Sequence, residues 1–360
     1  MSESFLFTIL KMEIKMAEHN IYEDDYNDSY DFNTTFVPNP NSLPCALQNL
    51  NPFADIALCV LLIIIFLLAV PGNVLVGLVI GSSRQALTSS DIYLFHLSIA
   101  DVMLALTLPI WAAAVVHGWI FGSFMCKILS LVLEVNFYTS ILFLVCISVD
   151  RYLAIVRSAV FRKTRRMVFS WAICGGVWAL GGALSLPALL NITFTHRNKT
   201  ICTDPFETEL LLTTRGLRHI LGFLLPLIIM VTCSCVTMMQ LLQTQGLRKH
   251  RAMRVIIAVV IAFLLCWMPY HLTMMVDTLD TAKVVTFNCA ERSRVNLALQ
   301  VTKNLALLHS CVNPVLYAFV GEKFRRNLGV LIRKRLEPEK SSAPRYSRST
   351  SQTSEVNRLL

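Results

Sequence analysis

The sequence predicts an all-α membrane protein, a bundle of seven transmembrane helices followed by a short amphipathic eighth helix. Its composition excludes an ordinary soluble domain, because 55% of the 360 residues are hydrophobic, only 15% are charged and the mean hydropathy is +0.58. Seven apolar runs each hold the roughly 20 residues that a helix needs to cross the hydrocarbon layer. These runs lie near 54–81, 92–116, 122–149, 167–192, 219–243, 254–277 and 296–320.

The runs divide the chain into four parts. An acidic outer tail precedes the bundle, and an amphipathic helix and a tail rich in serine and threonine follow it. The boundaries are 1–52, 53–320, 321–336 and 337–360. In the third part, apolar side chains recur on one helical face, as in a helix that lies along a membrane surface in contact with lipid. They are Phe324, Leu328, Leu331 and Ile332.

Sequons and basic residues predict which ends of the helices face outward. The four expected glycosylation sites lie in the N-terminal tail or between the fourth and fifth runs, at Asn27, Asn33, Asn191 and Asn198. Arginine and lysine gather in the opposite connections, as the positive-inside rule requires of cytoplasmic loops. We therefore expect a multi-pass plasma-membrane protein with its N-terminus outside and its C-terminus inside. The net charge of +9 mostly reports this inner face, which argues against nucleic-acid binding.

The eleven cysteines divide in the same way. Seven lie within apolar runs, where a cysteine behaves as a small hydrophobic residue. The other four fall on the oxidising face, where three pairings are available to them. Cys126, at the outer end of the third run, is well placed for Cys202, which leaves Cys45 to join Cys289. Free thiols on an exposed surface are the alternative.

Asp101 lies in the middle of the second run, where a charge costs at least roughly 2.5 to 3.5 kcal/mol, so it is a functional candidate. Neutral polar residues of the third and seventh runs fall at a similar depth, namely Asn136, Ser140, Ser310 and Asn313. One carboxylate with several neutral oxygens suits a sodium ion or a cluster of waters. A purely structural hydrogen-bonded network that includes Asn73 is the alternative.

Three further motifs predict a bundle that changes shape. Arg151, at the inner end of the third run, is flanked by an acid that can hold it and release it when a partner docks. Prolines in the sixth and seventh runs remove a backbone hydrogen bond and permit a bend. Prolines at these depths together favour a conformational switch over ordinary kinks. The predicted switch residues are Asp150, Arg151, Tyr152, Trp267, Pro269, Pro314 and Tyr317.

These residues resemble the landmarks of the rhodopsin-like G-protein-coupled receptors, one on each helix, and the resemblance covers about residues 45–336. The landmarks are Asn73, Asp101, Arg151, Trp178, Pro226, Trp267 and Pro314. Within that superfamily the segments 107–111, 150–156 and 249–256 resemble the chemokine receptors. The segments 119–122, 134–138 and 308–314 are similar to the CXC receptors of the interleukin-8 type.

The resemblance implies a receptor that binds a CXC chemokine and couples to an inhibitory heterotrimeric G protein, with calcium mobilisation and chemotaxis of leukocytes such as neutrophils as output. No cofactor is implied beyond an allosteric sodium ion. An enzyme is disfavoured, because no nucleophile and base pair or metal-ligand spacing is found. A channel or transporter is disfavoured by the lack of an inverted repeat. A scavenging receptor is the alternative, since Ser234 stands where the family usually has a tyrosine that steadies the active-state arginine.

The ligand side can be argued from charge. Residues 22–31 hold five acids and three tyrosines without lysine or arginine. Such a segment attracts a basic protein ligand, and its tyrosines are expected sulfation sites. A solvated, glycosylated stalk is the alternative. The predicted ligand residues are Tyr22, Asp24, Asp25, Tyr26, Tyr30, Arg215, Arg218, Asp277, Glu291, Arg292 and Lys303. Lys303 replaces a glutamate of many chemokine receptors, so it should repel a cationic ligand group.

The C-terminal tail is rich in hydroxyl groups. Phosphorylation by receptor kinases would turn this mildly basic strip anionic, which is a fitting signal for arrestin. An unmodified tail is the alternative. The expected sites are Ser341, Ser342, Ser347, Ser349, Thr350, Ser351, Thr353 and Ser354.

Overall fold

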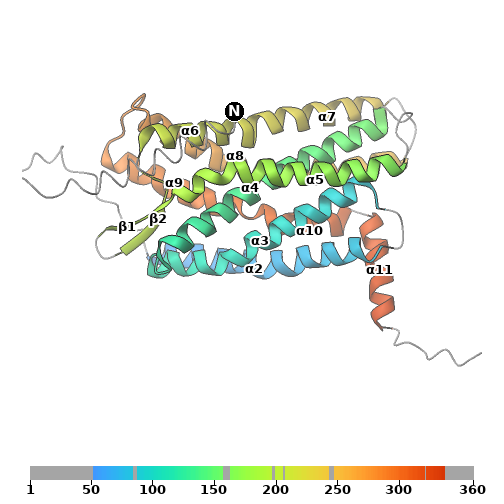
Figure 1. Ribbon diagram of the computed structural model, residues 1–360, viewed down its shortest axis with the longest axis horizontal. Helices are drawn as coiled ribbons and strands as arrows, with labels where there is room; N and C mark the ends of the chain where they lie inside the picture. The colour runs from blue at the N-terminus through green and yellow to red at the C-terminus, as the bar shows by residue number, and fades with distance from the viewer. Residues whose placement is uncertain are drawn as a thin grey trace, which may run out of the picture. The chain divides into compact units, whose positions relative to one another are not determined.

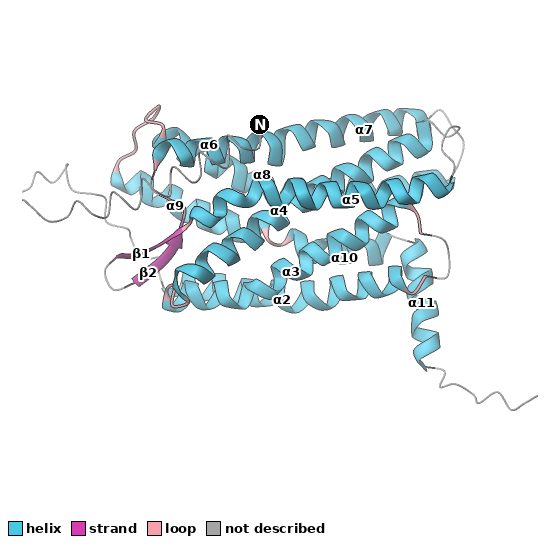
Figure 2. Ribbon diagram, viewed as in Figure 1, coloured by secondary structure: helices cyan, strands magenta, loops and turns pink. Residues whose placement is uncertain are grey.

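The computed structural model describes residues 52–83, 87–156, 163–196, 199–205, 207–242, 247–320 and 322–336. Within these residues helices dominate, and the long ones run side by side, with one two-stranded hairpin near one of their ends (Figures 1 and 2). By length and composition, six stretches of this part of the chain are able to cross a membrane. The predicted helical bundle is therefore present, and its departures from expectation lie in the fifth and seventh runs.

The first three runs form α2 (Pro52–Gly81), α3 (Ser89–His117) and α4 (Gly122–Val156), close to the predicted bounds. A capping box starts α3, in which the Thr88 hydroxyl accepts from the Asp91 amide and the Asp91 carboxylate accepts from the Thr88 amide. These bonds satisfy two of the amide donors that every helix leaves free at its N-terminus.

The fourth run, 167–192, was expected to be one helix, but its last part is not α-helical. Helix α5 (Lys163–Ser185) passes into a 3₁₀ turn, Leu186–Leu190, with Pro187 in its first turn. The chain then forms a hairpin of β1 (Ile192–His196) and β2 (Lys199–Thr203), antiparallel with Thr193 opposite Cys202. The apolar pattern did not predict this hairpin, because its strands are short and rich in threonine.

The fifth run begins earlier than 219, at the start of α6 (Thr208–His219). A π-helical turn, Ile220–Leu224, then leads into α7 (Leu225–Leu242). Pro226 accounts for the wide turn, because a proline ring clashes with the carbonyl four residues earlier, here that of Gly222. The turn packs tightly against α4, since a Cβ atom on Gly222 would lie 2.4 Å from Cε1 of Phe137.

The sixth run forms α8 (Leu247–Thr281), which is longer than predicted and contains Pro269. The seventh run was expected to be one helix over 296–320, but the structure divides it into α9 (Cys289–Ala306) and α10 (His309–Val320). Between them the Leu307 and Leu308 amides donate to Asn304 O and Leu305 O, which are only three residues back. The break thus lies one turn outside Asn313 and Pro314.

Polarity is arranged as a lipid environment requires. Buried polar residues such as Asp101 and Asn136 lie inside the bundle, whereas large apolar side chains such as Leu67, Val168 and Leu265 are mostly exposed on its outside. A helix bundle with an apolar exterior is stable in hydrocarbon and not in water. The buried core itself is centred on α4 and α8, where Phe137, Trp267 and their neighbours pack together.

The predicted eighth helix is α11 (Glu322–Leu336), which runs across the direction of the bundle helices in Figure 1. Phe324 packs against the edge of the core cluster, while Val330 and Ile332 stay exposed. The Asn327 amide donates to the Ser83 hydroxyl at the end of α2, 3.4 Å away. This helix is therefore attached to the bundle at its first turns and leaves apolar side chains free further along.

Candidate functional site

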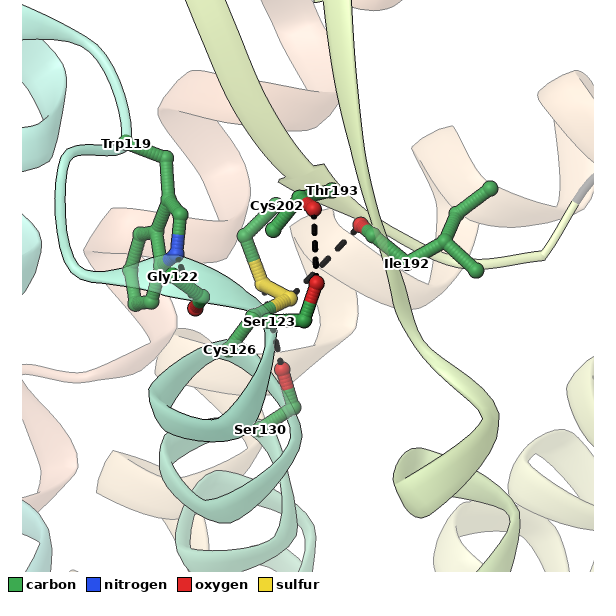
Figure 3. The surroundings of a disulfide bond; sticks show 8 residues. All are labelled: Trp119, Gly122, Ser123, Cys126, Ser130, Ile192, Thr193 and Cys202. Atoms are coloured by element: carbon green, nitrogen blue, oxygen red, sulfur yellow. Dashed lines mark hydrogen bonds between the residues drawn. A yellow bond between two sulfur atoms is a disulfide. The ribbon is translucent and has the colours of Figure 1, made fainter.

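At one end of the bundle, a disulfide joins the hairpin to α4 (Figure 3). Cys126 and Cys202 are bonded, as predicted. The Ser123 and Thr193 hydroxyls share a hydrogen bond of 2.9 Å, and the Trp119 amide donates to Thr200 O at 2.6 Å. Cys289 is also in a disulfide, and its predicted partner Cys45 lies outside the described residues. The hairpin is thus fixed to the start of α4 and to the loop before it.

A glycine is required where the hairpin meets the loop after α3. Gly118 has φ +78°, and a Cβ atom there would lie 2.8 Å from Cγ of Lys199 and 3.0 Å from Thr200 O. The Lys199 ammonium in turn donates to Val115 O at 3.1 Å and lies 3.8 Å from Asp55 Oδ2. The second strand is therefore held against the ends of α2 and α3.

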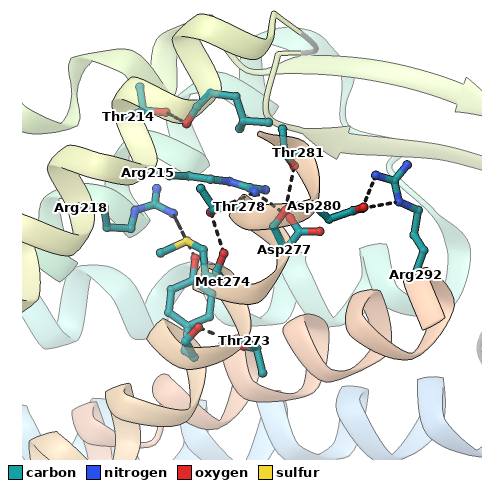
Figure 4. Close-up of polar contacts among 12 residues, drawn as sticks. Thr214, Arg215, Arg218, Thr273, Met274, Asp277, Thr278, Asp280, Thr281 and Arg292 are labelled. Carbon is teal, nitrogen blue, oxygen red and sulfur yellow. Dashed lines mark hydrogen bonds and ion pairs between the residues drawn. The ribbon is translucent and has the colours of Figure 1, made fainter. Parts of the chain in front are cut away.

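Charged residues of α4, α6 and α8 form ion pairs inside the bundle, and Figure 4 shows the residues of α6 and α8 that take part. Arg215 Nη1 lies 2.7 Å from Asp277 Oδ2, and both side chains are largely buried. Arg218 pairs with Glu134 and also donates to the Tyr270 hydroxyl at 3.0 Å. Two predicted ligand cations are thus already paired with acids, so a ligand that uses them must exchange one partner for another.

Sequence reasoning did not single out Glu134, although a signal was present. Glu134 is an acid within the apolar run 122–149, and an ionisable residue at such a place marks a site. With Tyr138, Asp204, Arg215 and Arg218 it lines a pocket between α4, the 3₁₀ turn and α6. The charged side chains of its lining are Glu134 of α4, Asp204 of the connection after β2, and Arg215 and Arg218 of α6.

The other predicted residues of this end are placed less centrally. Arg292 pairs with Asp280 at the connection of α8 and α9, which had not been predicted. Glu291 accepts from the Asn288 amide in the capping box that starts α9. Lys303 is exposed on α9. Asn191 ends the 3₁₀ turn and lines the pocket.

In the middle of the bundle, Trp267 is surrounded by rings. Its centroid lies 4.7 Å from that of Phe137 and 5.2 Å from that of His309. Its indole N–H has no hydrogen-bond partner among the residues that the structure describes. Trp267 is therefore held by packing alone, two residues before Pro269, which suits a side chain that changes position when helix α8 bends.

Asp101 accepts hydrogen bonds from three of its four predicted partners. Asn313 Nδ2 donates to Asp101 Oδ2 at 2.9 Å, and Asn136 Nδ2 and Ser140 Oγ donate to Oδ1 at 3.2 and 3.4 Å. Ser310 is not among them, because its hydroxyl donates to Leu307 O. The cluster joins α3, α4 and α10 around one fully buried carboxylate.

Two more residues complete this cluster. His309 Nε2 lies 3.7 Å from Asp101 Oδ1, a contact that the sequence analysis missed although the residue lies next to Ser310. Asn73 Nδ2 donates to Ser310 O at 2.8 Å, so it reaches the cluster through the backbone of α10. Ser310 O is free to accept this bond because Pro314, four residues further along α10, has no N–H to donate to it.

At the opposite end, Asp150 accepts a hydrogen bond of 2.7 Å from the Ser90 hydroxyl of α3. Arg151 and Tyr152 follow in the last turns of α4. Pro314 and Tyr317 lie in α10, and the Tyr317 side chain is not among those that the structure describes. The predicted switch residues are therefore spread along the bundle axis, from Trp267 in the middle to Arg151 at one end.

Several predicted sites lie outside the described residues. These are the acidic tail with Tyr22, Asp24, Asp25, Tyr26 and Tyr30, the sequons at Asn27, Asn33 and Asn198, and all eight predicted phosphorylation sites.

Comparison with known proteins decides the family. The family model described as 7 transmembrane receptor (rhodopsin family) matches residues 72–317. The C-X-C chemokine receptor type 2 of Oryctolagus cuniculus is 44% identical over 319 residues, which cover 86% of this chain and 88% of that one. The type 1 receptor of Homo sapiens is 43% identical over 315 residues, covering 85% and 89%. This chain belongs to the C-X-C chemokine receptors of the rhodopsin family.

The similarity to C-X-C receptors extends to mouse, where the type 2 receptor of Mus musculus is 42% identical over 327 residues. Because this family consists of receptors, the protein is not an enzyme, as expected. The apolar exterior and the family together make it a multi-pass membrane receptor with seven crossings, of which α9 and α10 form the last.

Proposed function

We propose that this receptor binds CXC chemokines of the interleukin-8 kind on its outer face and activates an inhibitory heterotrimeric G protein on its inner face. Calcium mobilisation and leukocyte chemotaxis follow as cellular output. The observation that carries the proposal is an identity above 40% to C-X-C chemokine receptors types 1 and 2 over more than four fifths of the chain. The matched length includes both ends of the helix bundle.

The ligand is proposed to bind in two steps. Its basic surface first meets the acidic segment 22–31, whose charge favours fast association with a cation. Its flexible end then enters the bundle beneath the hairpin, where Arg215, Arg218 and Asp277 lie in ion pairs. Replacing Asp24 and Asp25 by asparagine should weaken binding at low salt and reduce its dependence on salt.

Transmission is proposed to pass through α8. A ligand that contacts the outer part of α8 differently in two conformations shifts the equilibrium between them. The Trp267 indole N–H has no hydrogen-bond partner in the described residues, and Pro269 weakens the helix beside it, so this is where α8 bends at least cost. An outward bend opens the inner end of the bundle around Arg151.

The orientation supports this direction of signalling. We infer that the N-terminus lies outside and the C-terminus inside, an orientation that the sequons and the basic connections support. Receptor kinases and arrestin are the proposed partners of the hydroxyl-rich tail, and α11 is proposed to rest on lipid through its exposed Val330 and Ile332.

A sodium ion is the proposed allosteric ligand of the Asp101 cluster. The carboxylate and the Ser140 hydroxyl supply oxygen ligands, and Asn136 and Asn313 would turn their amide oxygens inward to complete the set. The donor set is thus compatible with a hard cation, in competition with the hydrogen bonds that Asp101 accepts from the two amides.

A calcium-release screen of transfected cells against a panel of CXC chemokines tests the proposal. The receptor should respond to at least one member, and blocking the inhibitory G protein should abolish the response. The matched variant is Arg151→Ala, which should keep chemokine binding and surface expression but lose nucleotide exchange on the G protein. Chemokine uptake without calcium release would favour the scavenging alternative, to which Ser234 gives some support.

A further inference from the structure

Helix α8 and the seventh crossing are interrupted at the same depth of the bundle. Pro269 removes one backbone hydrogen bond from α8, and the tight turn at Leu307 and Leu308 separates α9 from α10. Trp267, two residues before Pro269, and His309, the first residue of α10, are in ring contact with their centroids 5.2 Å apart. The two interruptions therefore lie side by side, and each is a place where its helix bends more easily than elsewhere.

On the outer side of these interruptions, α8 and α9 are joined by side chains at two levels. One turn beyond Pro269, the hydroxyls of Thr273 and Thr302 share a hydrogen bond of 2.8 Å. At the outer ends of both helices, Arg292 Nε donates to Asp280 Oδ2 at 2.9 Å, and the two side chains form an ion pair (Figure 4). Two contacts about 10 Å apart along α8 keep the helices from sliding past each other and from separating.

Asp280 also fixes the connection between the two helices. Its side chain is buried, and its Oδ1 accepts a hydrogen bond of 3.2 Å from the Phe287 amide. The capping box of Asn288 and Glu291 follows directly and starts α9. One carboxylate thus holds the end of α8, the connection and the first turns of α9. We call residues 270–306 the outer α8–α9 unit.

The outer α8–α9 unit meets α6 through polar contacts that a ligand is able to replace. Arg215 of α6 pairs with Asp277 of the unit. His219 of α6 shares a hydrogen bond with His271 of the unit. A chemokine group that binds Arg215 or Asp277 takes the place of a contact across this boundary and leaves the contacts within the unit intact. Such a ligand favours a conformation in which the unit has moved relative to α6.

We propose that the outer α8–α9 unit moves as one rigid piece when a chemokine binds, turning on the interruptions of α8 and of the seventh crossing. Asp280 and Arg292 are positioning residues that keep its two helices together, so Arg292 acts through Asp280. Because Trp267 and His309 touch where the unit turns, its motion changes how both side chains are packed. The inference rests on the proposed function and adds which part of the bundle moves.

Distances between nitroxide labels in the full-length receptor test the proposal. The labels are attached to Met275→Cys on α8, Leu297→Cys on α9 and Leu180→Cys on α5, all at exposed positions. Cys235 is replaced by serine because it is an exposed free cysteine. A bound CXC chemokine should leave the distance between positions 275 and 297 unchanged and alter both distances to position 180 by about 2 Å or more. A change between 275 and 297, or movement of one label or of neither relative to 180, overturns the inference.

Two further experiments connect the motion with signalling. A disulfide between Thr273→Cys and Thr302→Cys, formed by oxidation with copper phenanthroline, should leave chemokine-stimulated nucleotide exchange unchanged, and the unmodified receptor treated in the same way is the control. Arg292→Asp should lower this exchange severalfold, because it repels Asp280, and the exchanged pair Arg292→Asp with Asp280→Arg should restore it. Loss of exchange on forming the disulfide, or no recovery in the exchanged pair, counts against the rigid unit.

The two proposals fail in different ways. In a receptor that responds to a CXC chemokine, labels at 275 and 297 that move separately overturn the inference alone. If the unmodified receptor neither binds nor responds to any CXC chemokine, the proposed function and the inference both fail.

Discussion

His219 and His271 face each other between α6 and α8, with their Nδ1 atoms 3.1 Å apart. Both rings are buried, and one donates its Nδ1–H to the other. His219 is the last residue before the π-helical turn, and His271 follows Pro269 by two residues. The bond thus connects the two places at which neighbouring helices depart from regular geometry.

This pair should hold α8 in its resting position. Replacing His271 by phenylalanine keeps a ring that stacks on Phe223 but removes the bond, whose net contribution is about 1 kcal/mol. If the bond exists only in the resting state, ligand-independent nucleotide exchange on the G protein should rise about fivefold. His117→Phe, at the exposed end of α3, is the control and should leave the rate unchanged. A normal basal rate for His271→Phe would show that the bond persists in both states.

We expect the stability of the receptor to depend on Arg218 and Glu134 mainly because neither charge can be left buried without the other. Arg218→Met leaves the Glu134 carboxylate largely buried without its partner, and such a loss costs about 3 to 5 kcal/mol. The purified receptor in detergent should therefore melt at a clearly lower temperature. The double variant Arg218→Met with Glu134→Leu should recover most of the loss, because no charge is then left alone. Additive destabilisation in the double variant would contradict this account.

Close packing at the π-helical turn gives a third prediction. Gly222→Ala places a methyl group 2.4 Å from the Phe137 ring, and Phe137 is only 3% exposed and cannot swing aside. Overpacking of this kind costs about 1 to 3 kcal/mol, so the melting temperature should fall. Gly175→Ala is the control, since no atom lies within 4 Å of its added Cβ. That change should be neutral or stabilising by up to about 1 kcal/mol.

The sequence predicted the helices that are apolar throughout. It did not predict the polar helix α6 or the break that divides the seventh run. The run that became α2 has no charge from 56 to 83, and its bounds were close to those observed. Helix α6 was missed because Thr208–His219 is polar enough to resemble a loop. The break at Leu307 and Leu308 leaves no mark in hydropathy, since both residues are leucine.

The candidate site shows the same limit. An acid in an apolar run identified Asp101 and its depth, and three of its partners could be chosen because they lie at the same depth. Side-chain rotamers decide whether a hydroxyl donates to the carboxylate or to a carbonyl of its own helix. The prediction for Ser140 was therefore confirmed, and the prediction for Ser310 was wrong. Internal pairing of Arg215 and Arg218 depends on the spacing of three helices, which no pattern within one helix contains.

Sodium should bind in competition with the hydrogen bonds of Asp101. We expect agonist affinity to fall when sodium replaces choline at constant ionic strength, and Asp101→Asn to abolish the difference, because the amide offers no charge to the cation. The buffer comparison at fixed salt separates this effect from screening of the acidic tail. Equal affinities in both salts for the unmodified receptor would leave the cluster as a hydrogen-bonded network only.

Ser234 should limit the output of the receptor. Its hydroxyl is buried and has no partner within the described residues, so it contributes little to the structure around it. Family members usually carry a tyrosine here, whose hydroxyl steadies the active-state arginine, the role assigned to Arg151. Ser234→Tyr should therefore raise chemokine-stimulated nucleotide exchange severalfold. Ser234→Ala should behave as the unmodified receptor, since only an unpaired hydroxyl is removed. If Ser234→Tyr does not raise nucleotide exchange, Ser234 is not what limits coupling to the G protein. A chain that then binds chemokine without signalling is better explained as a scavenging receptor.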